Sequence, residues 1–298
     1  MLVLKPAPLA KIWGDKALLD YGCDDIDGMI GEACTVCADP KCSSLIVSLT
    51  PPMTLAEYYR MYADQFGWTG PFPLTITIVS AREDLSLQVH PDREKAKELE
   101  GLEDGKEESW VFLRAGAQIV AGTKCRKEEI PMLIAENRWE EIYARMTIED
   151  HDYVHVRPGT LHAISAGSLV YEIMQSNDVT YRFYDYDRTD SQGNKRQLHL
   201  SKALACLNTE LAAEKTRFEE GRVYEAERYR ISSRRIEGKT EIENPEEVFA
   251  CITVLEGSFL WNGISVFKGY SVILFPKEKA GISGRAVLMT AYAKPRKE

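Results

Sequence analysis

After about residue 214 the sequence breaks into short apolar runs that end at turn residues, a pattern that allows strands but few helices. Glycines separate many of these runs, at positions 257, 263, 269, 281 and 284. Short strands at such regular spacing bury their apolar faces by packing as a sandwich or a small barrel. We therefore predict a β module over 214–298, with strands at 227–235, 247–255, 257–261, 264–267, 270–274 and 286–293.

The first 213 residues alternate β-like runs with helical patterns. Runs rich in Val, Ile, Thr and aromatic residues predict strands over 73–79, 85–90, 108–113, 117–121, 153–156 and 169–175. Apolar residues at helical spacing predict helices over 54–66, 91–103, 127–145 and 200–213, with Pro131 as a candidate break. We expect a mainly β fold with added helices, in which a domain over 1–213 precedes the module over 214–298. The charge-mixed stretch 210–222 is the expected linker.

The charge of the chain excludes one large class of partner. The 298 residues carry 37 Lys and Arg against 46 Asp and Glu, a net charge of −9 that repels a nucleic-acid backbone. No apolar run reaches the ~18 residues that span a bilayer, and the N-terminal apolar stretch is too short for a signal peptide. Seven cysteines are too few for a disulfide scaffold of this length. We expect a cytoplasmic protein with reduced thiols and with neither a nucleic-acid nor a membrane partner.

Four polar residues are candidate metal ligands. Gln88 and His90 are two apart in a predicted strand, so their side chains share one face. Glu108 begins the next β-like run, and His162 follows a Pro-Gly turn. Two imidazoles and two side-chain oxygens suit a borderline divalent ion such as Zn²⁺. Taken singly, each has a simpler interpretation: a strand histidine is usually just hydrogen-bonded, and Glu108 could belong to an exposed acidic pair with Glu107.

Several motifs in a fixed order resemble the type I mannose-6-phosphate isomerases in their short bacterial form, members of the cupin superfamily. They are KIWG at 11–14, QVHPD at 88–92, GKEESW at 105–110, PGTLHAI at 158–164 and QSNDVTYRFYDYDR at 175–188. The resemblance implies two cupin modules, of which 1–213 is catalytic and 214–298 is metal-free. It also implies one zinc ion per chain, held by Gln88, His90, Glu108 and His162.

The same resemblance implies an enzyme that interconverts mannose 6-phosphate and fructose 6-phosphate through an enediol, as a monomer or a homodimer. Such a reaction needs a cation that stabilises charge on oxygen and a base that reaches the C–H bond. Lys106, Glu172 and Arg182 are the candidate catalytic residues, and the identity of the base stays open.

Three further residues match the substrate-binding pattern of this family: Trp13, Ser86 and Arg188. For Arg182 and Arg188 the alternative is ordinary pairing with the nearby aspartates 178, 185 and 187. Thr77 stands where the family usually has a lysine, Asp15 replaces a glycine, and Met174 often corresponds to a glutamine. These departures leave two alternatives open, a non-catalytic sugar-binding cupin and an isomerase of another aldose.

Two sets of residues are weaker candidates for metal binding. Cys34, Cys37 and Cys42 could form part of a zinc knuckle, but they lack a matching second pair, and the resemblance aligns them with ordinary strand and turn residues. The remaining imidazoles, His151, His155 and His199, are expected at the surface or behind the ligands. Since no histidine follows His199, the C-terminal module cannot build an imidazole site.

Overall fold

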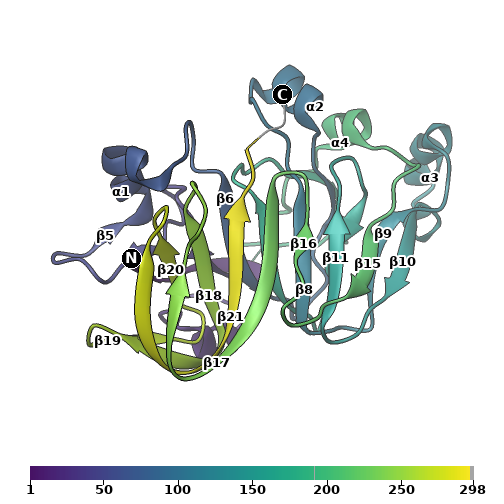
Figure 1. Cartoon of the computed structure of the whole chain (residues 1–298). Coiled ribbons are helices and arrows are strands. Elements are labelled where there is room, and N and C mark those ends of the chain that lie inside the picture. Colours follow the sequence, from purple (N-terminus) through teal and green to yellow (C-terminus); the bar gives the residue numbers. More distant parts are fainter. Residues whose placement is uncertain (191, 296–298) are drawn as a thin grey trace. The chain divides into compact units, whose positions relative to one another are not determined.

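The computed structural model describes residues 1–190 and 192–295, and the chain divides into two compact units (Figure 1). One unit comprises Ala81–Arg217, and the other combines Met1–Ser80 with Phe218–Glu298. Residues 1–80 therefore pack with the C-terminal strands, which differs from the division expected at residue 213. Both units are built mainly of antiparallel strands with a few short helices, so the predicted fold class is confirmed. Within the described residues, no helix is long and apolar enough to cross a membrane.

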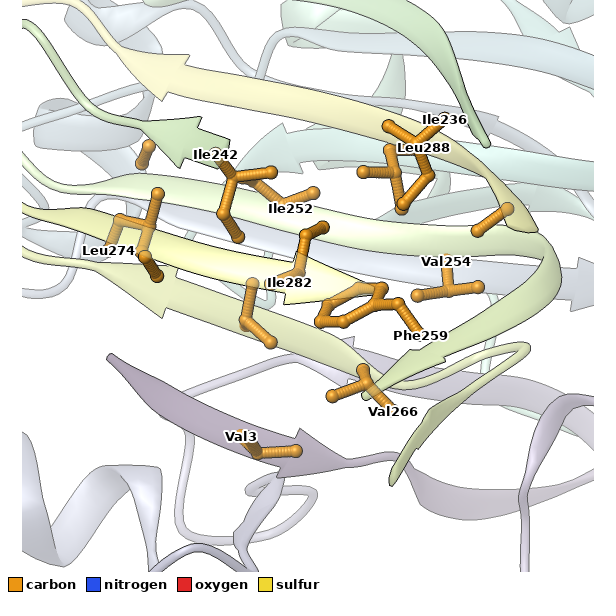
Figure 2. Close-up of a cluster of buried hydrophobic side chains, with 14 residues drawn as sticks. Val3, Ile236, Ile242, Ile252, Val254, Phe259, Val266, Leu274, Ile282 and Leu288 are labelled. Carbon is orange, nitrogen blue, oxygen red and sulfur yellow. The ribbon is translucent and has the colours of Figure 1, made fainter. Parts of the chain in front are cut away.

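A nine-stranded sheet dominates the unit that contains both chain ends. Its order is β16-β17-β21-β18-β20-β1-β4-β5, with β19 paired to β18. The bounds of these strands are β1 Leu2–Lys5, β4 Leu45–Ile46, β5 Met53–Thr54, β16 Tyr224–Glu225, β17 Tyr229–Glu243, β18 Ala250–Trp261, β19 Ile264–Phe267, β20 Ser271–Leu274 and β21 Lys279–Ala293. Alternate residues of the long strands face one core, in which Ile236, Val254, Phe259, Ile282 and Leu288 lie together (Figure 2). Val3 of the N-terminal strand completes this core.

The same unit contains three further strands in the order β6-β3-β2, and a short helical segment. These elements are β2 Ala7–Asp15, β3 Ile30–Val36, β6 Leu74–Ser80, the 3-10 turns η1 Ala17–Tyr21 and η2 Ala63–Phe66, and the helix α1 Leu55–Tyr62. Thr54 and Glu57 form a capping box that starts α1. Phe66 then packs edge-on against Tyr59 and Phe249. The helix predicted over 54–66 is therefore present as α1 and η2.

Unit Ala81–Arg217 consists of two antiparallel sheets that face each other. One has the order β15-β11-β8-β13 and the other β10-β9-β12-β7-β14. The bounds are β7 Leu87–Val89, β8 Glu108–Arg114, β9 Gln118–Thr123, β10 Tyr143–Thr147, β11 Asp152–Val156, β12 His162–Ala163, β13 Leu169–Gln175, β14 Tyr181–Tyr184 and β15 Glu214–Arg217. The strands predicted here from β propensity are all present.

Short helices cover the outer face of the second sheet. They are α2 Arg93–Glu100, α3 Ile130–Ala135, α4 Leu200–Cys206 and the 3-10 turns η3 Lys127–Glu129 and η4 Trp139–Glu141. Leu87, Val89, Tyr181 and Phe183 point outward and pack with Leu133 and other apolar residues. Because strand side chains alternate between faces, the residues between them point into the space between the two sheets. This alternation positions the polar residues of β7 and β14.

Several predicted element boundaries differ from the structure. The runs 247–255 and 257–261 form one strand, β18, which continues through a bulge between Val254 and Glu256 and through Gly257 at φ +71°, where a Cβ would lie 2.1 Å from the carbonyl oxygen of Arg285. Only Ile130–Ala135 of the long helix predicted over 127–145 is α-helical, and Pro131 lies in its first turn and does not break it. The helix predicted over 200–213 ends at Cys206.

Candidate metal centre

Register across three strands brings three of the predicted residues onto one face. His162 of β12 lies opposite Gln88 of β7, and Gln88 lies opposite Arg182 of β14. Directly paired residues of antiparallel strands project to the same side of a sheet. His162, Gln88 and Arg182 therefore form a row across the inner face of the second sheet.

The first sheet supplies the opposing side of the site. Glu108 and Trp110 are two apart on β8, and they pair with Met174 and Glu172 of β13. The Trp110 ring contacts the His162 ring edge-on at a centroid distance of 5.7 Å, so these inner faces meet. Residues of five short strand segments thus converge although they are far apart in the chain.

The converging atoms are two imidazole nitrogens and a carboxylate. Nε2 of His90 lies 3.0 Å from one oxygen of Glu108, and Nε2 of His162 lies 3.2 Å from the other. All three side chains are at most 1% exposed. Glu108 is therefore not part of an exposed acidic pair, and that alternative interpretation is wrong.

Hydrogen bonds behind the two imidazoles fix which nitrogen carries a proton. Nδ1 of His90 donates to the carbonyl oxygen of Val179, and Nδ1 of His162 donates to that of Thr160, both at 2.8 Å. A carbonyl oxygen only accepts, so each Nδ1 bears a hydrogen and each Nε2 points at the carboxylate of Glu108. Burial, together with the nearby charge of Lys106, lowers the pKa of His90 to about 4.

This arrangement fits a cation. Nε2 of His90 and both carboxylate oxygens of Glu108 are buried without a hydrogen-bond partner among the described residues. Lone pairs that face one another at about 3 Å repel unless a positive charge lies between them, and an unpaired buried acceptor costs about 1–3 kcal/mol. His90, Glu108 and His162 thus form a group that can hold a metal ion.

Gln88 stands next to these three residues. Its amide nitrogen lies 3.2 Å from Nε2 of His162. A half-turn of the amide about its Cγ–Cδ bond exchanges nitrogen and oxygen and directs Oε1 toward the same point. Two imidazoles, a carboxylate and an amide oxygen form a donor set suited to a borderline divalent cation.

A loop that the sequence interpretation did not assign holds His90 in place. Asn177 donates to the carbonyl oxygen of Gly105 at 2.6 Å and accepts from the backbone N–H of Val179 at 3.2 Å. Gln175 accepts from the backbone N–H of Glu107 at 3.0 Å. These contacts fix the Val179 carbonyl that orients the imidazole, as partners behind metal ligands usually do. The polar motif between Glu172 and Arg182 is the sequence signal for this loop, although its individual members have no role assigned from the sequence.

The three candidate catalytic residues lie around the ligand group. Nζ of Lys106 is 3.7 Å from Glu108, and this lysine is 7% exposed. Glu172 accepts a hydrogen bond of 3.0 Å from the indole N–H of Trp110. Arg182 is half-buried, donates to the carbonyl oxygen of Gln197 at 3.1 Å, and has a buried Nε without a hydrogen-bond partner among the described residues. Burial lowers the pKa of Arg182.

The predicted substrate-binding residues are placed less uniformly. Ser86 is 3% exposed and precedes Gln88 by two residues. Arg188 is bound to Asp185 at 2.6 Å and also donates to the carbonyl oxygen of Asp84, so the alternative of aspartate pairing describes its contacts. Trp13 belongs to the other unit, where it is buried against Gly31. The binding roles of all three stay predictions.

Neither of two further imidazoles joins the group. His155 lies on the outer face of its sheet, where it contacts the Ser109 hydroxyl at 3.0 Å and Glu107 at 3.3 Å. His199 accepts from the backbone N–H of Arg182 at 3.2 Å. Both therefore lie behind or outside the ligand group, as the sequence predicts.

Comparisons with known proteins agree with this geometry. No protein-family model matches the chain. It is 36% identical over 209 residues to the mannose-6-phosphate isomerase ManA of Bacillus subtilis. The match covers 68% of this chain and 66% of ManA, slightly under two thirds of the length of ManA. It is 34% identical over 274 residues to YvyI of the same organism, which bears the same family name, covering 87% and 86%. A crystal structure of a Bacillus subtilis mannose 6-phosphate isomerase superposes with a TM-score of 0.84 at 30% identity, covering 98% of this chain and 99% of the other. The family named by the motifs is thus confirmed, and with it the enzyme class: this chain belongs to the mannose-6-phosphate isomerases, which are aldose–ketose isomerases.

Proposed function

We propose that this protein is a zinc-dependent isomerase that interconverts mannose 6-phosphate and fructose 6-phosphate through an enediol. The observation that carries the proposal is the pair of imidazoles whose Nε2 atoms face the buried carboxylate of Glu108, while a backbone carbonyl holds the Nδ1 of each ring. A cation bound between these atoms gives each of them a partner, and family membership supplies the reaction. We assign Gln88, His90, Glu108 and His162 as the residues that hold the ion.

The ion, when bound, acts as a Lewis acid that stabilises negative charge on the sugar oxygens. The side chains around it do the rest. Isomerisation moves one proton between C1 and C2 and another between the two oxygens. Lys106 is the cationic group nearest the ligands, so it can hold a proton at a sugar oxygen. Glu172 is oriented by Trp110, and it is the carboxylate best placed to exchange the carbon-bound proton.

Arg182 is the third proposed participant. It shares the row with Gln88 and His162, and its guanidinium is only partly hydrogen-bonded. Because Gln88 and Arg182 are half-buried whereas His90, Glu108 and His162 are buried, the substrate reaches the ligands from the side of Arg182. A planar guanidinium at this entrance binds an anionic oxygen, either of the enediolate or of the phosphate.

A second candidate substrate follows from two departures in the phosphate pattern. Thr77 replaces a family lysine and is 1% exposed, and Asp15 is engaged with the Ser80 hydroxyl at 3.0 Å and the backbone N–H of Ala17 at 2.7 Å. An aldose without phosphate therefore competes as the substrate. The ratio of kcat/KM for mannose 6-phosphate to that for mannose decides between them: a ratio well above one supports the phosphorylated sugar.

The proposal is tested by metal analysis and turnover on the same variants. His90→Ala and His162→Ala each remove a ligand atom, and both should lose bound zinc and isomerase activity together. His155→Gln is the matched control, because it changes a histidine of the same unit whose ring lies on the outer face of its sheet. Full activity in a metal-free His162→Ala protein contradicts the proposal. Binding of sugar without exchange of the C2 proton in the wild type selects the non-catalytic cupin instead.

Three further assignments complete the proposal. All seven cysteines are free thiols, as is usual in a reducing cytoplasm, where we place the enzyme. We propose a monomer or a homodimer with one zinc ion per chain. The module over 214–298 is assigned a structural role, in packing or subunit contact, and the catalytic part remains 1–213.

A further inference from the structure

Three cysteines of the unit that contains both chain ends converge at one point. Cys34 lies on β3, Cys37 directly follows that strand, and Cys42 lies in the next loop. Their sulfur atoms all lie within 4.8 Å of one another, and those of Cys37 and Cys42 are 3.0 Å apart. Cys34 and Cys37 are 1% exposed, and Cys42 is half-buried. The metal-binding group around His90 contains no cysteine, so these thiols are a separate cluster.

Backbone and hydroxyl contacts hold the loop that carries them. The Ser44 hydroxyl accepts from the backbone N–H of Cys37 at 3.0 Å and donates to the carbonyl oxygen of Cys34 at 2.9 Å. The backbone N–H of Asp39 points at the Cys37 sulfur at 3.4 Å. Backbone N–H groups directed at sulfur favour the thiolate, and a fixed loop removes the entropy cost of gathering ligands. The three sulfurs are therefore preorganised.

The charge state of the cluster also suits metal binding. Hydrogen bonds from Cys34 and Cys37 lower the pKa of Cys42 to about 3, and the nearby Lys11 and Lys41 add to this effect. Hydrogen bonds with Cys37 and Cys42, together with burial, raise the pKa of Cys34; the pKa of Cys37 is raised to about 12, because its hydrogen bond with Cys42 and burial outweigh the opposing hydrogen bond with Cys34. A metal ion that takes all three sulfurs as ligands replaces the protons that the thiols carry.

We propose that Cys34, Cys37 and Cys42 form a second metal site, which binds a soft, thiophilic cation through three thiolates. A trigonal ion with metal–sulfur bonds of about 2.3 Å holds its sulfurs about 4 Å apart, inside the spread of this cluster. Cys42 sits on the half-buried side and moves outward by roughly 1 Å to reach that spacing.

The number of ligands selects the kind of ion. Among the described residues no histidine, aspartate or glutamate completes the cluster. Zn²⁺ in structural sites takes four protein ligands, whereas soft ions such as Cu⁺ are selected by thiolates. A disulfide between Cys37 and Cys42 is the rival outcome, but it needs an oxidant and leaves Cys34 without a function.

Titration with Cd²⁺ alone, in the presence of a reductant that contains no thiol, tests the site. We expect thiolate-to-metal charge-transfer absorption that saturates at one equivalent, which imidazole and carboxylate ligands cannot produce. Cys42→Ser should abolish this absorption with little change in folding, because Cys42 is half-buried. Cys34→Ser should also abolish it, with thermal unfolding measured to show that the variant folds. Cys125→Ser is the matched control, a half-buried thiol outside the cluster, and it should bind as the wild type does.

Two results overturn the proposal. One is the absence of charge-transfer absorption in the reduced wild type. The other is its persistence in Cys42→Ser. Because the readout is specific for sulfur, it does not depend on whether zinc binds at His90 and His162. Isomerase turnover of Cys42→Ser should match that of the wild type, so failure of this proposal and failure of the proposed isomerase are distinguishable.

Discussion

The neutral state of His90 leads to a prediction about acid stability in the metal-free protein. Nε2 of this residue faces a carboxylate at 3.0 Å, which allows two incompatible descriptions. A protonated imidazole would form an ion pair with Glu108, and acid would then stabilise the fold. A neutral imidazole, held by the Val179 carbonyl, makes acid destabilise it.

The sign follows from the two pKa values. The ordinary pKa of histidine is 6.5, and burial in the folded state lowers the pKa of His90 to about 4. Between these values the unfolded chain binds a proton that the folded chain does not, so this contribution is present above pH 6.5 and is lost as the pH falls toward 4. The lowered pKa of His90 in the folded state corresponds to roughly 3 kcal/mol of unfolding free energy.

Urea unfolding of the chelator-treated protein at pH 7 and near pH 4 measures this loss. His90→Gln removes the titrating group from both the folded and the unfolded state. The unfolding free energy of the wild type relative to this variant should therefore fall by about 3 kcal/mol between pH 7 and pH 4. His155→Gln removes a histidine outside the ligand group and corrects for general acid effects. If the wild type gains stability over His90→Gln as the pH falls, the lone-pair description of the site is refuted.

Three further outcomes are expected. Trp110→Phe removes the indole N–H that donates to Glu172 at 3.0 Å, so it should lower the unfolding free energy by about 1–3 kcal/mol in urea. It should also lower kcat while metal analysis finds an unchanged zinc content. An unchanged kcat argues against a catalytic Glu172. Asp185→Asn leaves two arginines, Arg188 and Arg196, without their shared carboxylate. It should lower the unfolding free energy by about 3–5 kcal/mol in the same assay. A smaller loss shows that solvent already screens these charges. Gly257→Ala places a Cβ 2.1 Å from a carbonyl oxygen at φ +71°, whereas Gly263→Ala at φ +82° meets open space. Left-handed backbone strain should lower the unfolding free energy of both variants by ~1–2 kcal/mol, and only Gly257→Ala should lose more than that.

The sequence contains most of the information on the inner face of the metal-binding unit. Gln88 and His90 are two apart in one strand, so strand periodicity alone predicts that these two project together, whereas Glu108 on another strand is joined to them only by the family resemblance. The row from His162 through Gln88 to Arg182 depends on register between strands, which the alternation of one strand does not reveal. The partners of the imidazoles are backbone carbonyls, and residue identity carries no signal for them.

Two other features depend on long-range contacts. The pairing of Leu2 with Ile273 places the N-terminal residues in the C-terminal unit, and no local pattern indicates a partner so distant in sequence. The convergence of the three cysteines is hidden from the sequence for a similar reason. Its spacing lacks a second pair, but the turn after β3 folds Cys42 back onto Cys37, which spacing rules do not consider.

The strand β1 has two partner strands: β4, where Ile46 pairs with Leu4 at 42 positions along the chain, and β20, where Ile273 pairs with Leu2 at 271 positions along the chain. At a translation rate of about 5–20 residues per second, the longer of these intervals lasts roughly 15–55 s. Leu2, Val3 and Leu4 are at most 4% exposed in the finished fold, so until β20 is made the nascent chain has only β4 to pair with this apolar segment. A chain that stops before β20 leaves one edge of β1 without its partner strand.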